Sequence, residues 1–183
     1  MQLGRRKDGL VRYSHISGMP FVPDLNGGLN VPQVYCRDMS GTVCFTDDII
    51  FRNRDNGLFR MFVYLKSSAE IAAARELLVH VEAWSNREII ADETPFIVED
   101  VDTKDGIIPG KNPVYQVATA EEFAASPLCT RRPAPACYDK YQLRDKVGGK
   151  FAIMRPDRFI FAVCSGKDDL RRAVDRMLEV LQR

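Results

Sequence analysis

The chain has 183 residues, enough for one domain that buries about two-thirds of its surface without disulfides. Its formal net charge of +1 provides no basic footprint for nucleic acid, and no apolar run is long enough to span a membrane or form a signal-peptide core. We therefore expect a cytoplasmic protein that binds neither nucleic acid nor membranes.

The cysteines and histidines argue against a disulfide framework and against a zinc site. Five cysteines is an odd number, their spacing is irregular, and no Cys-x-x-Cys occurs. The two histidines, His15 and His80, are far apart in sequence. We expect reduced thiols, no metal and no cofactor.

The first part of the chain is predicted to be an extended arm, residues 1–32, leading to a domain over residues 33–183. Glycine and proline interrupt every hydrophobic period in the arm. Tyr13 and Phe21 are among its aromatic anchors. Packing of the arm on its own domain is the simpler interpretation, and packing on a neighbouring subunit stays open.

Two strands, Gln33–Arg37 and Thr42–Phe45, are predicted around the turn-rich quartet Asp38–Gly41. A two-residue loop at the centre of this quartet would place Cys36 and Cys44 on opposite faces of the hairpin. That register argues against a disulfide between them.

The middle of the chain is predicted to contain a strand–helix–strand unit. Leu58–Leu65 is an almost unbroken apolar run, typical of a central strand. A helix capped by Ser67 or Ser68 then continues to about Trp84, with one apolar stripe at helical spacing. The following elements are a strand over Pro95–Val101, a strand over Val114–Ala118, and a short helix that begins with a capping box at Thr119 and ends at Pro127.

The last part of the chain is organised around an apolar hairpin. Two β-rich runs, Phe151–Met154 and Phe159–Cys164, flank Arg155–Arg158, where proline and aspartate favour a type I turn. Because consecutive residues are apolar, both faces of the sheet should be covered. A terminal helix follows, with Ser165 as its candidate cap.

This order of elements is the plan of an α/β thioredoxin-like domain in its peroxiredoxin-type elaboration, a central mixed sheet with helices on both faces. In redox-active members a cysteine sits where the first central strand meets its helix, because the helix N-terminus lowers the thiol pKa. That junction reads Leu65-Lys66-Ser67-Ser68-Ala69 here. The missing thiol argues against a disulfide reductase or a peroxidase.

Three segments resemble the C-terminal domain of phenol-hydroxylase-type flavin monooxygenases: Val31–Asp38, Gly57–Leu65 and Met154–Ile160, which contains an Arg-Pro-Asp turn. Tyr13-Ser14-His15-Ile16-Ser17 approximates the connector of that family. The resemblance implies a redox-silent thioredoxin-like domain that packs on a catalytic part and contributes to dimerisation. The family's flavin domain begins with Gly-x-Gly-x-x-Gly, which is missing from this chain. The chain by itself therefore cannot hydroxylate by the flavin mechanism.

Two functional hypotheses remain. The first is a stand-alone, redox-inactive protein that binds an aromatic or polyketide-type small molecule and isomerises or cyclises it without a cofactor, as in natural-product tailoring. The alternative is a non-catalytic dimerisation or docking module, with a homodimer or a flavoenzyme as its partner.

Candidate site residues are polar groups that suit proton transfer or the binding of a polar ligand. Histidine titrates near neutral pH, and a phenol can donate to a developing enolate. The catalytic candidates are Tyr13 and His15, and the substrate-binding candidates are Asp38, Arg52, Asp139 and Tyr141. Each binding candidate also has a structural interpretation: turn former for Asp38, solvated charge for Asp139 and for Arg52 in a predicted loop over Asp47–Asn56, and strand packing for Tyr141.

Overall fold

The computed structural model describes residues 2–5, 11–15, 20–52, 58–100, 112–127 and 140–182, with the backbone alone for the first two ranges. The strands are β1 (Gln2–Arg5), β2 (Val11–His15), β3 (Tyr35–Arg37), β4 (Val43–Phe45), β5 (Arg60–Ser67), β6 (Phe96–Asp100), β7 (Val114–Val117), β8 (Phe151–Met154) and β9 (Ile160–Cys164). The α-helices are α1 (Thr46–Ile50), α2 (Ile71–Trp84), α3 (Ala120–Ala125), α4 (Gln142–Val147) and α5 (Lys167–Leu181). Short 3-10 helices are η1 (Pro23–Leu25), η2 (Ser68–Glu70) and η3 (Ala91–Glu93).

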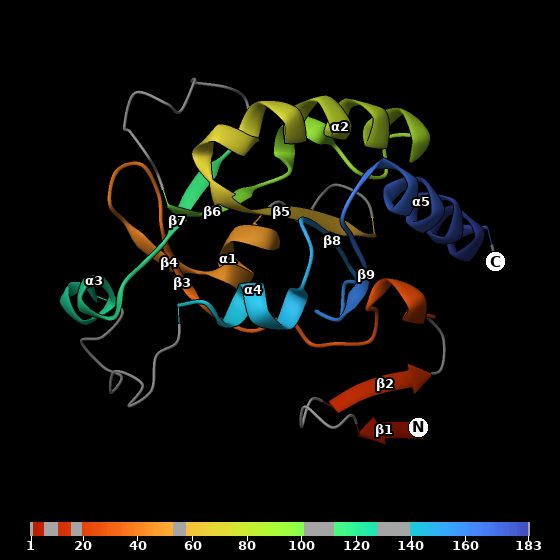
Figure 1. Cartoon of the computed structure of the whole chain (residues 1–183), viewed down its shortest axis with the longest axis horizontal. Coiled ribbons are helices and arrows are strands. Elements are labelled where there is room, and N and C mark those ends of the chain that lie inside the picture. Colours follow the sequence, from red (N-terminus) through yellow and green to blue (C-terminus); the bar gives the residue numbers. More distant parts are fainter. Residues whose placement is uncertain are drawn as a thin grey trace.

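Within the described residues, seven strands form one mixed sheet in the order β4-β3-β7-β6-β5-β8-β9. The strands β5, β6 and β7 are parallel, while β8 is antiparallel to β5 and β3 to β7. The β5-α2-β6 unit and the β8-β9-α5 unit lie side by side, with β5 paired to β8 (Figure 1). This is the thioredoxin-like arrangement, and it confirms the predicted fold class.

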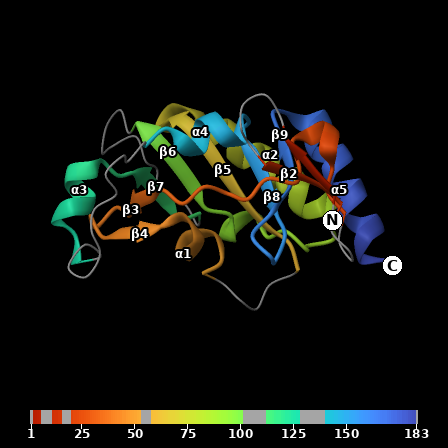
Figure 2. The same cartoon turned by 90° about the horizontal axis from the view of Figure 1, so that it is seen from below.

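Helices cover both faces of the sheet, as predicted from its apolar strands. The helices α2 and α5 cover one face, and α1 and α4 cover the other (Figure 1). Figure 2 shows that α4 lies toward the carboxyl ends of β5 and β6, while α1 lies toward their amino ends. Alternate strand residues enter two separate apolar cores; Val63 and Leu65 pack with α2 and α5, and Phe62 with α1 and α4. None of the described helices has the length and apolar content that crossing a membrane requires.

The C-terminal hairpin of β8 and β9 is covered on both faces, as predicted. Every residue of β8 and β9 is buried. The Arg158 amide donates to the Arg155 carbonyl at 3.1 Å, which closes the turn. The Arg155 side chain is 2% exposed, bonded to Asp157 and stacked over the Phe21 ring at 4.3 Å. Arg155 and Asp157 therefore have the structural role that the sequence indicates.

The segment over residues 20–34 packs on its own domain along the edge of β9. The Val22 amide donates to the Phe161 carbonyl at 3.0 Å, and the Ile160 amide donates to Leu29 at 2.8 Å. A Cβ at Gly27 would lie 2.3 Å from the Phe161 carbonyl oxygen, so glycine is required for this close approach. The prediction of an arm without elements is wrong for residues 2–5 and 11–15, because β1 and β2 pair as a separate two-stranded antiparallel sheet.

The register predicted for the first hairpin is wrong by one residue. Cys36 lies directly opposite Cys44, so the two residues share a face. The carboxylate of Asp38 accepts hydrogen bonds from the amides of Ser40 and Thr42, both at 2.9 Å. These bonds favour a longer loop in which Gly41 adopts a φ of +88°.

Helices occupy two places where the sequence predicts none. In the predicted solvated loop, α1 forms because Ile49 and Ile50 pack on the sheet and Thr46 donates to the Pro32 carbonyl at 3.3 Å. The helix α4 ends at Gly148, which has a φ of +69° suited to a helix C-terminus.

The predicted cap of the last helix is also corrected. Gly166, not Ser165, is the N-cap of α5. The Ser165 amide instead donates to the Asp169 carboxylate at 3.2 Å.

Candidate functional site

The carboxyl end of β5 borders a pocket of about 450 Å³. Ligands of open α/β sheets commonly bind beyond the carboxyl ends of parallel strands, where loops and helix ends diverge. We call this the carboxyl-edge pocket. Its lining residues are Tyr64, Lys66, Glu70, Arg144, Gly148, Gly149 and Lys150. Strand β5, the β5–η2 junction, α4 and the residues before β8 thus supply its walls.

One lining residue, Tyr64, belongs to a buried phenol–carboxylate pair. Tyr64 donates its hydroxyl proton to Glu99 Oε1 at 2.5 Å, and both residues are buried. Arg144 Nη1 donates to Glu99 Oε2 at 3.4 Å, which compensates the carboxylate charge. Burial, followed by the hydrogen bond to Glu99, raises the pKa of Tyr64 well above its usual range. Tyr64 is therefore a neutral phenol at physiological pH.

A second charged pair closes the opposite side. Lys150 donates to Glu70 Oε2, while Glu70 Oε1 accepts the Lys66 amide at 3.2 Å. The bond from Lys150 lowers the pKa of Glu70, so this carboxylate stays ionised. The Lys66 side chain is exposed at the pocket.

Two glycines let the chain pass close to the sheet here. Gly148 ends α4, and a Cβ at Gly149 would lie 2.3 Å from a methyl carbon of Val163. The glycine pair of the sequence thus positions Lys150 at the pocket rim.

This pocket lies at the junction where redox-active members of the fold carry their cysteine. Ser67 caps the 3-10 helix η2 there by accepting the Ala69 amide at 3.2 Å. The long helix α2, predicted to be capped by Ser67 or Ser68, has Glu70 as its N-cap instead. The described residues that line the pocket include no cysteine.

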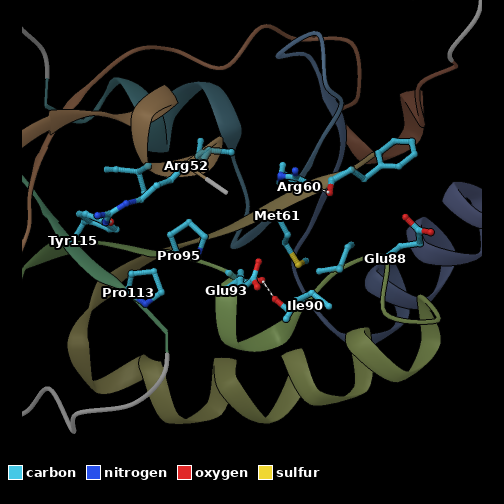
Figure 3. Close-up of a pocket in the computed structure, with 14 residues that line it drawn as sticks. Arg52, Arg60, Met61, Glu88, Ile90, Glu93, Pro95, Pro113 and Tyr115 are labelled. Atoms are coloured by element: carbon cyan, nitrogen blue, oxygen red, sulfur yellow. Dashed lines mark hydrogen bonds between the residues drawn. The ribbon is translucent and has the colours of Figure 1, made fainter. Parts of the chain in front are cut away.

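A second cleft lies at the amino ends of the same parallel strands and is shown in Figure 3. Its volume is about 60 Å³, room for a few water molecules. Apolar residues such as Met61, Pro95 and Pro113 line it, with the Arg52 and Arg60 side chains at one side (Figure 3). We call it the amino-edge cleft.

Searches with the sequence give no matching family model and no matching curated protein. Two solved structures resemble the chain distantly. The thioredoxin domain of a thiol-disulfide oxidoreductase from Bacteroides vulgatus has a TM-score of 0.48 and 11% identity, covering 82% of this chain and 96% of that chain. Yeast Sco1 has a TM-score of 0.47 and 13% identity, covering 84% and 94%. Because these likenesses are weak, the thioredoxin-like assignment depends on the strand order and connections of this chain.

The binding candidates predicted from sequence are dispersed over the fold. Asp38 holds the β3–β4 turn; slight burial opposes ionisation, but hydrogen bonds led by the Ser40 hydroxyl lower its pKa. Arg52 lies at the amino-edge cleft, where it donates to the Tyr115 hydroxyl at 3.3 Å. Tyr141 lies nearest the carboxyl-edge pocket, with its ring 4.5 Å from the guanidinium of Arg144.

The remaining candidates are not placed by the described side chains. Tyr13 and His15 lie in β2, opposite Leu3 and Gln2, and only their backbone is described. Asp139 lies outside the described residues.

Sequence reasoning missed Tyr64, Glu99 and the basic residues around them. A usable signal was present at Glu99, a carboxylate at the end of the buried run Phe96–Val98. Lys66 similarly ends the apolar run of β5. Charged residues at the carboxyl ends of adjacent parallel strands indicate a site, whereas the partner Arg144 belongs to a helix that the sequence does not predict.

Proposed function

We propose that this chain is a redox-inactive thioredoxin-like protein that binds a small acidic aromatic or polyketide-type molecule in the carboxyl-edge pocket. The observation that carries the proposal is a pocket of about 450 Å³ lined in part by Tyr64 of the buried Tyr64–Glu99 pair. Small-molecule sites typically have volumes of about 300–1,000 Å³ and a few convergent polar groups.

The charges around the pocket favour an anionic ligand. Lys66, Arg144 and Lys150 contribute three positive charges to its lining, and Glu70 contributes one negative charge. Glu70 and Glu99 are bonded to two of these cations, Lys150 and Arg144, so the three positive and two negative charges leave a net charge of +1. A carboxylate, phenolate or enolate could therefore bind without leaving a protein carboxylate unpaired.

The chemistry available at this site is proton transfer. A ligand hydroxyl can donate a hydrogen bond to the Tyr64 oxygen while Tyr64 donates to Glu99. Through Tyr64, a proton leaving the ligand can reach the Glu99 carboxylate, and the lysines stabilise the enolate that remains. For a ligand that binds as its enol, this O–H deprotonation gives the enolate that a cofactor-independent isomerase reprotonates at carbon or a cyclase closes into a ring.

The docking-module alternative calls for a broad apolar surface. Among the described residues, the exposed large hydrophobic side chains are Met39, Leu58 and Val79, which come from three distant parts of the chain. They do not make a continuous patch of the size that stable interfaces use. Dimerisation and a flavoenzyme partner stay predictions from the phenol-hydroxylase resemblance.

Incubation of the purified protein with phenolic and polyketide-type acids, without flavin, tests the proposal. We expect saturable binding by calorimetry, and conversion of enolisable ligands that a Tyr64→Phe variant loses. Binding without conversion would remove the enzymatic part alone. Absence of binding across the panel would remove the proposed function.

A further inference from the structure

The β3–β4 hairpin places two thiols directly opposite each other. Cys36 pairs with Cys44, and the Asp38 amide donates to the Thr42 carbonyl at 3.0 Å. Since hydrogen-bonded pairs alternate in antiparallel strands, Cys36 and Cys44 also form a hydrogen-bonded pair, with Cα atoms about 5.5 Å apart. A disulfide spans Cα distances of about 4.4–6.8 Å. Both thiols are free, and Cys44 Sγ lies 3.6 Å from the Cys36 carbonyl oxygen.

We propose that Cys36 and Cys44 form a reversible intrachain disulfide when the protein meets a disulfide oxidant. Cys44 is half-buried on the edge strand β4, so the oxidant reaches it first, while Cys36 is fully buried. With oxidised glutathione, the Cys44 thiolate attacks one sulfur and releases one glutathione thiolate. The Cys36 thiolate then attacks Cys44 of the mixed disulfide and releases the second glutathione. The protein dithiol is oxidised, and glutathione disulfide is reduced to two thiols.

The surroundings of the two thiols make this reaction slow at neutral pH. Burial, with the nearby carboxylates of Asp38 and Asp48, raises the pKa of Cys44 to about 11, and Arg52 opposes the shift. Burial raises the pKa of Cys36 further. The thiolate fractions, and with them the rate, therefore increase with pH.

The disulfide is expected to be easily reduced. In a hydrogen-bonded strand pair the Cβ atoms lie farther apart than a disulfide prefers, so closing the bond strains the hairpin. Strained bonds are the labile ones. The bond would tie edge strand β4 to β3, whose Tyr35 stacks on Phe123 of α3 with ring centroids 3.5 Å apart.

Peptide mapping tests the proposal on the full chain. The protein is incubated with oxidised glutathione under native conditions, quenched with acid, alkylated and digested with trypsin, which cleaves after Arg37 and so separates the two cysteines. We expect a linked pair of peptides carrying Cys36 and Cys44, formed faster at higher pH and lost on mild reduction.

Three variants complete the test. Cys164→Ser, which removes a thiol at the other edge of the sheet, should leave the linked peptides unchanged. Cys44→Ser should abolish them. A variant in which Cys129→Ser and Cys137→Ser remove the cysteines outside the described residues should still form the link. Recovery of alkylated Cys36 after Cys44 has been fully glutathionylated, or a link from Cys44 to another cysteine, would overturn the proposal.

Discussion

The two ends of the parallel strands differ in how the space beside them is divided. At the carboxyl edge, charged residues from four segments meet around about 450 Å³ of open space. At the amino edge, prolines, apolar side chains and charged residues such as Glu93 enclose a cleft of about 60 Å³, and a wider pocket of about 590 Å³, lined in part by Arg52 and Arg60, opens beside it. The same strands supply both ends, so the difference comes from the segments attached to each strand end and from the helix that lies over them. Here α4 with its terminal glycines leaves one open pocket, whereas α1 lines the narrow cleft with Ile49 and Ile50 and the wider pocket with Asp47 and Asp48.

The largest expected effect comes from matched tyrosine substitutions at the two edges. Tyr64→Phe removes the hydroxyl bonded to buried Glu99, and we expect it to lower the free energy of unfolding by about 1–3 kcal/mol, since a buried carboxylate loses a partner. Tyr115→Phe removes a bond to the exposed Arg52 and should change stability by less than about 0.5 kcal/mol. Urea denaturation measures both variants. Equal losses would show that Tyr64 is no more important to its edge than Tyr115.

Removing one positive charge at each edge tests which of the two sites binds the ligand. Lys66→Gln should weaken the binding of an acidic aromatic ligand about two- to fivefold, the value of one exposed charge pair. Arg52→Gln should leave the affinity unchanged, because Arg52 lies at the amino-edge cleft. Isothermal titration calorimetry measures both. The reverse pattern would favour the amino edge and the sequence-predicted candidate Arg52.

A smaller effect concerns the pH dependence of Glu70. Because the bond from Lys150 holds its pKa below the usual value, Glu70 contributes stability above its ordinary pKa of 4.5, and that contribution disappears as the pH falls through the lowered value. Lys150→Gln should return the Glu70 pKa toward its ordinary value and reduce the acid-dependent part of stability. NMR titration of the Glu70 carboxyl group measures its pKa in the original protein and in Lys150→Gln. Identical titration curves in these two proteins would refute the role of Lys150.

Much of the fold could be predicted from the sequence because its signals are local. The apolar runs of β5, β8 and β9 identify buried strands, and the Thr119 capping box begins α3 where expected. The helices α1 and α4 have only five and six residues, too few to show a hydrophobic period in the sequence. They form because they pack against the sheet.

The candidate site was less predictable for a related reason. Tyr64, Glu99 and Arg144 come from three separate elements, and only the sheet order brings them together. The predicted register of the β3–β4 hairpin is wrong because hydrogen bonds to the Asp38 side chain set the length of the loop. Both cases show that polar side chains decide details which hydrophobic patterns leave open.

The most direct test of the account is to map the binding of a small aromatic acid by two-dimensional amide NMR. We expect concentration-dependent shifts at the amides of Lys66, Gly149 and Lys150, with none at Arg60 or Tyr115. Shifts confined to the amino-edge cleft would contradict the account, and so would a spectrum that the ligand leaves unchanged.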